Sequence, residues 1–547
     1  MMKYFLLLIF ASAALFLNGA ETVKIKSQAP HITVNMLPTA GSSDFRKGPV
    51  FRIFRCTNRT LTPQKIEIII EDAGYRHKGR CGIVYPLLLL PLATSEWGVL
   101  VPNIVDLSDP VGFRVQAESG IRVESNAGSS HHTPWRRYGM ASPSFKPDFF
   151  EYVLGEDIEK APQPVAEWST DSRAYAGNSL IVLSSGDPLS PALKEALRLA
   201  AARGSRVLVL VMGDDPWPSY AGTEKKGKAF EEKIGFGSWV VLRTLTTENN
   251  PEWTKFVKEK HHLAKGGKYR SAYSNFRWRD KKLMHYLASD TKTDSWTCKV
   301  ELPQPPIPMG RLTFIMVCFV IMIGPVNLLV LKKYHAELWG IVTIPLLSLL
   351  FSGTVIGCVV VFEGFTSHGK GEVETLLDQR NGLAASRGGF AVYAPGGVGE
   401  FHFSPDDLLY FKNPGKVRGK VTKNDYIYTG ALVRARMNFS YSAVRSGFIS
   451  EKIAVTEKEG QVEIVNGLGV TVTSFYLRSA KGKVYKLASP LLPGKRAVLT
   501  SIPRLPVGEE EIERNCYRAA VAEPFFITPG VKVGSYEHRQ TVYGRWR

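Results

Sequence analysis

Two stretches without a charged side chain, residues 312–331 and 338–362, constrain this chain more than any other feature. About 20 apolar helical residues cross a hydrocarbon core of about 30 Å, and each stretch is at least that long. The loop between them is short, so the pattern predicts two transmembrane helices in residues 311–363. The alternative is a helical hairpin that is buried in a large soluble core.

The N-terminus predicts how this hairpin is oriented. Lys3 precedes an apolar run over residues 4–17, and small residues that include Ala20 follow, which is typical of a secretory signal peptide in residues 1–20. Export of the next segment places Lys332 and Lys333 in the cytoplasm, as the positive-inside rule prefers. We therefore expect the parts before and after the hairpin to lie outside the cytoplasm.

The net charge of the chain limits the classes of binding partner that we expect. The 547 residues have a formal net charge of +19. Outside the cytoplasm, this charge favours anionic lipid head groups or an acidic envelope polymer over nucleic acid. Residues 255–286 mix cations with aromatic side chains, which can stack bases. In an exported segment, a basic surface for lipid or protein, or an ordinary solvated face, is the better interpretation.

The cysteines predict a disulfide and no metal site. Cys56 and Cys81 are close in the sequence and share one predicted domain, so they are candidates for a disulfide, with Cys298 or Cys516 as competing partners. No cysteine has the spacing of a zinc ligand. The adjacent histidines at 131–132 and 261–262 are expected to be solvated, and we expect no cofactor.

The soluble parts differ in their periodicity. Residues 21–120 and 364–547 contain short alternating strands that are separated by turn residues, as expected of a β-sandwich or, for the second segment, a barrel. Residues 121–300 contain two continuous apolar strands, 178–185 and 206–212, on either side of a helix that Ser190 and Pro191 begin and Gly204 ends. Such a unit predicts a parallel, doubly wound α/β domain. A proline-rich linker, 301–310, leads to the hairpin.

Several short motifs resemble a known architecture. The stretch from Leu180 to Gly213 is similar to the class I glutamine amidotransferase-like fold, as it occurs in membrane-anchored bacterial proteins with flanking β-domains. The motif from Gly324 to Asn327, the pair Val465-Asn466 and the later Leu492-Pro493-Gly494 resemble the same proteins. This resemblance implies a location in the bacterial cytoplasmic membrane, with the bulk of the chain extracytoplasmic.

The nucleophile of a true amidotransferase is missing from the expected turn. The resemblance implies a cysteine after the second strand, but the residues at that turn are Met212-Gly213-Asp214. It also implies a histidine with a carboxylate two residues later, and neither His261 nor His262 is followed by one. Covalent catalysis needs an activated nucleophile beside a base. We therefore expect no enzymatic activity. The alternative is a hydrolase with a relocated site at the strand ends, a ligand cleft formed by Ser184, Ser185, Asp187, Asp214 and Asp215.

The second span also carries a packing motif. Gly353 and Gly357 form a small-residue face that lets another helix approach closely. The sequence leaves two roles for this face open: packing against the first span, or formation of a homodimer. Together these features predict a membrane-anchored envelope protein for scaffolding or recognition, whose partners are membrane lipid and other envelope or membrane proteins.

Overall fold

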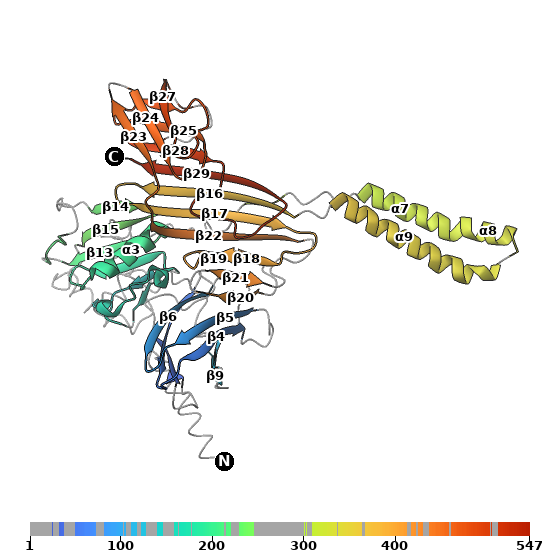
Figure 1. Cartoon of the computed structure of the whole chain (residues 1–547), viewed down its shortest axis with the longest axis horizontal. Helices are drawn as coiled ribbons and strands as arrows, with labels where there is room; N and C mark the ends of the chain where they lie inside the picture. The colour runs from blue at the N-terminus through green and yellow to red at the C-terminus, as the bar shows by residue number, and fades with distance from the viewer. Residues whose placement is uncertain are drawn as a thin grey trace, which may run out of the picture.

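The computed structural model covers the whole chain, and β-sheets dominate it (Figure 1). It describes the residues 24–25, 32–37, 50–72, 81–101, 103–104, 111–117, 122–126, 139–145, 158–161, 163–176, 178–212, 215–219, 229–244, 300, 302, 309–335, 337–363, 367–412, 417–422, 425–429, 437–458, 461–503, 505 and 512–546. The predicted signal peptide, the histidine pairs, the basic stretch 255–286 and Asp214 lie outside these residues.

The described strands form four sheets. In spatial order, the first contains β1 (Lys24–Ile25), β2 (Ile32–Leu37), β3 (Val50–Asn58) and β6 (Thr94–Val101). The second sheet contains, again in spatial order, β18 (Glu400–Phe403), β21 (Tyr426–Thr429), β20 (Val417–Val421), β5 (Cys81–Leu89), β4 (Gln64–Asp72), β8 (Val111–Ala117) and β9 (Arg122–Asn126).

The third sheet contains, from one edge to the other, β11 (Ile158–Lys160), β10 (Gly139–Ala141), β12 (Leu180–Ser184), β13 (Arg206–Met212), β15 (Gly237–Thr244) and β14 (Phe230–Ile234). The fourth contains, again from edge to edge, β23 (Lys452–Lys458), β24 (Gln461–Gly467), β27 (Arg496–Ile502), β26 (Val484–Lys486), β25 (Val472–Arg478), β28 (Cys516–Val521), β29 (Ser535–Arg545), β16 (His368–Asp378), β17 (Leu383–Tyr393), β22 (Asn438–Phe448), β19 (Leu408–Lys412) and β7 (Asn103–Ile104).

Two sheets join strands from before and after the apolar hairpin. β5 pairs in parallel with β20, and β7 pairs in parallel with β19. The aromatic rings of Tyr85 on β5 and Tyr426 on β21 lie edge to face, with centroids 6.4 Å apart. The sequence pattern predicts separate domains for residues 21–120 and 364–547. In the structure, backbone hydrogen bonds join strands of these two segments. No local sequence pattern predicts that strands so far apart in the chain pair with each other.

The expected strand–helix–strand unit is present. β12, α3 (Pro191–Arg203) and β13 follow the predicted bounds closely, and the two strands pair in parallel. The Ser190 hydroxyl accepts a hydrogen bond from Leu193 N, and Gly204 at φ 125° ends the helix in a conformation that side chains disfavour. β14, at the edge, is antiparallel to β15.

Helix α3 packs between two sheets. Leu193, Leu197 and Ala200 are buried within the cluster that includes the parallel strands. On its other side, Ser446 of β22 donates a hydrogen bond of 2.9 Å to Leu199 O, and the Arg387 guanidinium of β17 lies 4.6 Å from the Phe236 ring centroid. The long strands after the hairpin thus cover the helix (Figure 1).

One pattern of strand pairing occurs twice. Near the N-terminus, β2–β3–β6 and β5–β4–β8–β9 are consecutive neighbours, and near the C-terminus β23–β24–β27 and β26–β25–β28–β29 repeat that order. In the second copy, Ile464 of β24, Phe475 of β25 and Tyr517 of β28 share one buried cluster. The strands of this copy therefore pack around one core.

The apolar hairpin projects from this β-rich body (Figure 1). It consists of α7 (Met309–Ile321), a π-helical turn (Met322–Val326), α8 (Asn327–Lys333) and α9 (Gly340–Glu363). Two segments, Thr313–Lys333 and Gly340–Gly357, are long and apolar enough to cross a membrane, with mean hydropathies of 2.7 and 1.9. Their windows are only 11% and 0% buried within the protein, which is not what a soluble core would give.

Candidate functional site

The order of the parallel sheet reverses between β10 and β12. The chain passes from β10 outward to β11, then returns to β12 and continues to β13 on the other side. In open α/β sheets, ligands bind outside the carboxyl ends of the strands at such a reversal. We define the switch-point rim as the residues that follow these strands: Ser142, Ser144, Ser184, Ser185, Asp187 and Asp215.

A carboxylate and a buried serine join the two strand ends. Ser142 Oγ donates to Asp187 Oδ1 over 2.9 Å, while Ser184 N donates to Asp187 Oδ2 over 2.7 Å. Ser142 is fully buried, and its Oγ lies 2.6 Å from the Oγ of the exposed Ser144. Both oxygens of Asp187 therefore hold the local backbone and the neighbouring strand.

A second pair lies one strand further along the sheet. Ser185 Oγ donates to Asp215 Oδ2 over 3.2 Å, and Arg243 Nη1 donates to the Asp215 carbonyl over 3.1 Å. The Arg243 guanidinium lies 6.0 Å from the ring centroid of Trp217. The structure thus brings together four of the five cleft residues that the sequence indicates, and Asp214 lies outside the described residues.

Sequence reasoning missed Ser142 and Ser144. They follow β10, a strand of only three residues without the long apolar run of β12 and β13. Ser142 is in place because Gly139, Met140 and Ala141 pair in parallel with β12. A Ser-x-Ser sequence after a strand is the only local signal, and it is too common to single out a site.

The rim offers polar recognition more readily than chemistry. A serine nucleophile needs a base beside it, and Asp187 contacts the buried Ser142 and not the exposed Ser144. Within the described part of the chain, no group of three histidine, cysteine or carboxylate side chains could hold a metal ion. Ser144 is the exposed group at this edge, so a ligand would meet hydroxyl donors and acceptors there.

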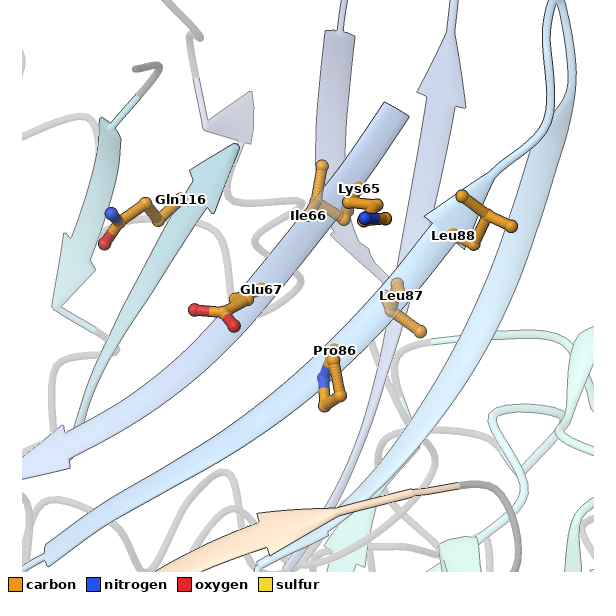
Figure 2. A pocket seen from close by; sticks show the side chains of 7 residues that line it. All are labelled: Lys65, Ile66, Glu67, Pro86, Leu87, Leu88 and Gln116. Atoms are coloured by element: carbon orange, nitrogen blue, oxygen red, sulfur yellow. The ribbon is translucent and has the colours of Figure 1, made fainter. Parts of the chain in front are cut away.

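A shallow groove lies on the outer face of the second sheet (Figure 2). Its volume is about 430 Å³, and it is lined by Lys65, Ile66, Glu67, Pro86, Leu87, Leu88 and Gln116. Lys65 faces Leu88 across the β4–β5 pair, and Glu67 faces Pro86. Leu88 is 60% exposed, so this face combines apolar surface with one charge of each sign.

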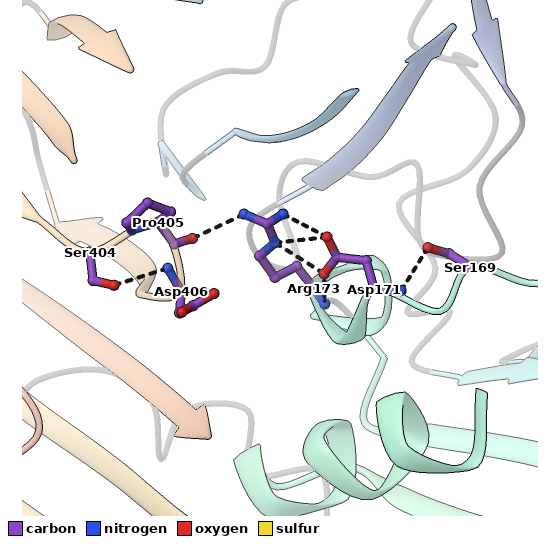
Figure 3. Close-up of polar contacts among 6 residues, drawn as sticks. All are labelled: Ser169, Asp171, Arg173, Ser404, Pro405 and Asp406. Atoms are coloured by element: carbon purple, nitrogen blue, oxygen red, sulfur yellow. Dashed lines mark hydrogen bonds and ion pairs between the residues drawn. The ribbon is translucent and has the colours of Figure 1, made fainter. Parts of the chain in front are cut away.

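A polar network lies where the α/β unit meets the strands after the hairpin (Figure 3). Arg173 binds both oxygens of Asp171 and donates to the Pro405 carbonyl over 3.4 Å. Burial lowers the pKa of Arg173, but the hydrogen bonds and charge of Asp171 outweigh it and raise the pKa above its ordinary value. Nearby, burial lowers the pKa of Arg203 to about 10, partly offset by Asp171 and Asp406. The hydrogen bond from Arg173 to the Pro405 carbonyl joins the two parts.

The predicted disulfide between Cys56 and Cys81 is not formed. Cys56 is a free, buried thiol. Asn58, two residues further on, donates to Leu89 O at the far end of β5, whereas Cys81 begins that strand. Eight residues of strand span about 26 Å, while a disulfide needs Cα atoms within about 7 Å. The two cysteines are close in the sequence but lie toward opposite ends of strand β5.

The small-residue face of the second span does not contact the first. Within the described residues, and apart from the adjacent residues and backbone of α9 itself, no atom lies within 4 Å of a Cβ placed on Gly353 or Gly357. The spans instead meet through contacts such as Phe319 with Phe351, whose ring centroids are 5.2 Å apart. In the structure this motif does not pack against the first span, and its face is open to another helix.

Comparisons with known proteins leave the family open. No family model and no curated protein matches the chain. Among solved structures, the yeast delta-COP mu-homology domain with a Dsl1 peptide is 9% identical over 33% of this chain and 95% of that one, with a TM-score of 0.20. The M1 zinc metallopeptidase from Deinococcus radiodurans is 10% identical over 18% and 26%, with a TM-score of 0.12.

A Paenibacillus cycloisomaltooligosaccharide glucanotransferase is 11% identical over 45% of this chain and 36% of that one, with a TM-score of 0.17. The matched part covers about a quarter of the metallopeptidase and about a third of the glucanotransferase. Such low similarity in sequence and structure carries no inference about the fold or the activity of this chain, so its function has to be argued from its own residues.

Proposed function

We propose that the chain is a non-enzymatic envelope protein, anchored by its hairpin in the bacterial cytoplasmic membrane, that serves as a scaffold or recognises other envelope proteins. The pairing of β5 with β20 carries the proposal. Strands that share backbone hydrogen bonds lie on the same side of a membrane, so the hairpin between them crosses an even number of times. Two crossings satisfy this, and lysines at the turn favour a cytoplasmic turn.

The extracytoplasmic body offers two recognition surfaces. The switch-point rim presents Ser144, and the groove of Figure 2 presents Leu88 beside Lys65 and Glu67. In this proposal the α/β unit is a degenerate amidotransferase-like domain that has kept the fold and lost the nucleophile. The sheets that connect the parts hold both surfaces in a fixed relation, which is what a scaffold needs.

Site-specific photocrosslinking in cells tests recognition. A benzophenone amino acid at Ser144 or Leu88 is expected to give discrete adducts with envelope proteins, whereas the same group at the exposed Lys458 of β23 serves as the matched control. Adducts from one of the first two positions, and not from Lys458, support the proposal. Identical adducts from all three positions would contradict it.

Cysteine labelling tests the anchor. Cysteines introduced at Gly310 and Lys370 are expected to react with an impermeant maleimide added outside intact cells, and one at His335 only after permeabilisation. Labelling of all three from the same side would mean that the hairpin does not cross the membrane.

A hydrolase is the second candidate, since the rim gathers serines and carboxylates at the strand ends. In that case Ser144 would be the nucleophile, and Ser142 would relay its proton to Asp187. The purified chain should then react with a fluorophosphonate at Ser144 and lose this reaction in Ser144→Ala. We expect no labelling, and we expect glutamine to stay intact, because Met212 and its neighbours supply no thiolate.

A further inference from the structure

The strongest unassigned site lies between the two spans, near their turn. A groove of about 630 Å³ is lined by Asn327, Leu328, Leu331 and Lys332 of α8 and by Gly340, Ile341, Ile344 and Pro345 of α9. This volume is within the range of about 300–1,000 Å³ that small-molecule sites occupy. Leu328, Ile341 and Ile344 are 62%, 77% and 42% exposed, so the groove opens to the surroundings of the hairpin.

Asn327 is the unusual member of this lining. It is only 8% exposed, and its Nδ2 has no hydrogen-bond partner in the described part of the chain. It follows the π-helical turn that contains Pro325, where the missing N–H and the bulk of the ring force the helix to widen. In a hydrocarbon environment an amide without an acceptor is strongly unfavourable, so the site is built for an acceptor from outside.

Lys332 gives the groove a charged end. It lies five residues after Asn327, about 7.5 Å further along the helix axis, toward the turn. At the edge of a bilayer, a lysine can keep its ammonium in the head-group region while its stem packs on apolar neighbours. The groove therefore has apolar walls, a cation at the water interface and an amide donor at its deeper end.

We propose that this groove binds one anionic glycerophospholipid. Lys332 pairs with the phosphate, the glycerol backbone lies against Leu328, Ile341 and Ile344, and Asn327 Nδ2 donates to an ester carbonyl, from which the acyl chains continue toward the bilayer centre. Along the groove the charge of Lys332 lies at the turn and the amide of Asn327 lies about 7.5 Å deeper, and along such a lipid the phosphate and the ester carbonyls follow in the same order. The inference rests on the proposed membrane anchor.

A second transmembrane helix fits this groove less well. Close helix approach uses small residues on both sides, but Gly340 is the only small residue in the groove, whose apolar lining consists of branched side chains and Pro345. A helix over the groove would also cover Lys332, whose charge is costly to bury. The open face of Gly353 and Gly357 is the better place for a partner helix.

Native mass spectrometry of the full chain in detergent tests the proposal. With dioleoyl phosphatidylglycerol and dioleoyl phosphatidylcholine as competing probes, we expect one bound phosphatidylglycerol, favoured about tenfold. Lys332→Gln should abolish the preference, and Asn327→Leu should weaken binding of both lipids. The controls are Lys333→Gln, outside the groove, and Thr354→Val, whose hydroxyl already donates to Leu350 O. Both should bind like the wild type.

The other outcomes separate the two claims. Equal binding of both lipids that Lys332→Gln leaves unchanged would overturn the lipid site, even when cysteine labelling at His335 shows that the hairpin crosses. A dimer that Asn327→Leu dissociates would assign the groove to a second copy of the chain and overturn it too. Loss of lipid preference together with failed crossing would overturn both the site and the anchor.

Discussion

Asn58 and Asn466 make the same three hydrogen bonds in the two copies of the repeated strand pattern. Each Oδ1 accepts from the backbone N two residues on, over 2.9 and 3.1 Å. Each Nδ2 donates to the carbonyl four residues on, over 2.9 and 2.8 Å. Each also reaches across to a leucine carbonyl in a later loop, Leu90 O at 3.1 Å and Leu491 O at 3.0 Å. Both side chains are fully buried.

Replacing either asparagine should destabilise the protein to a similar extent. Asn58→Ala and Asn466→Ala each leave buried backbone groups without partners, so we expect a loss of about 1–3 kcal/mol in the free energy of unfolding. Denaturant titration of the detergent-solubilised chain measures it. Asn381→Ala, whose amide reaches only the side chain of Asp378, is the control and should have little effect. A large effect at one position alone would contradict the equivalence of the two sites.

Asp187 should matter for stability more than an exposed carboxylate. Asp187→Asn replaces one accepting oxygen by a donor that faces either Ser184 N or Ser142 Oγ, so we expect a loss of about 1–3 kcal/mol. Glu231→Gln on the exposed side of the edge strand β14 is the control and should stay within about 0.5 kcal/mol. Equal melting temperatures for both variants would show that the rim does not hold β10 against β12.

The buried pair of Asp407 and Arg445 should be far more sensitive than a surface pair. Arg445 donates to both Asp407 oxygens, over 2.7 and 2.9 Å, and the Asp407 side chain is 2% exposed. Arg445→Met leaves a buried charge behind and should cost about 3–5 kcal/mol. Arg55→Met, which breaks a half-exposed pair with Glu96, should cost no more than about 1 kcal/mol.

The pH dependence of Arg445→Met provides a second readout. Burial raises the pKa of Asp407, and Arg445 opposes this rise. Without the arginine, the pKa of Asp407 should rise further, so protonation removes the stranded charge at mildly acidic pH. The loss should therefore be smaller at pH 5 than at pH 8, and an equal loss at both values would argue against a charge effect.

Two histidines should make stability depend on pH in opposite directions. A hydrogen bond to Asp425 raises the pKa of His402, although burial lowers it slightly, whereas burial lowers the pKa of His538. The stabilisation from His402 is complete below the unfolded pKa of about 6.5 and is lost as the pH rises through the folded pKa. For His538, stability falls as the pH drops below about 6.5.

Single substitutions separate these contributions. His402→Gln should destabilise more at pH 5.5 than at pH 8, by a modest amount because the ring is 53% exposed and salt screens its partners. His538→Gln should destabilise less at pH 5.5 than at pH 8. Melting temperatures at the two pH values measure both, and the same sign for both variants would contradict the assignment.

Cys56 should be unreactive in the folded protein. The residue is 1% exposed, and burial raises the pKa of its thiol to about 12. Since only the thiolate is nucleophilic, maleimide at pH 8 should leave Cys56 unmodified until the chain is unfolded. Mass spectrometry of peptides after labelling checks this, with the partly exposed Cys516 as the comparison. Cys56 recovered in a disulfide would contradict the structure.

The sequence by itself determined the local elements. The apolar hairpin, the strand–helix–strand unit whose helix begins after Ser190, and several strands in the two β segments follow from periodicity, capping and turn residues, which act over a few neighbours. Four of the five predicted cleft residues do lie at one edge of the parallel sheet, because the ends of neighbouring parallel strands must meet. Only Asp214 remains outside what the structure describes.

Only the tertiary structure decided which distant segments meet. The pairing of β5 with β20, the contact of Ser142 with Asp187 and the separation of Cys56 from Cys81 depend on how whole sheets stack. Backbone hydrogen bonds are the same for every sequence, so a strand pattern does not name its partner. The partner is selected by burial summed over many side chains, as in the aromatic cluster of Phe401, Phe403 and Tyr441, and no short window of the sequence contains that sum.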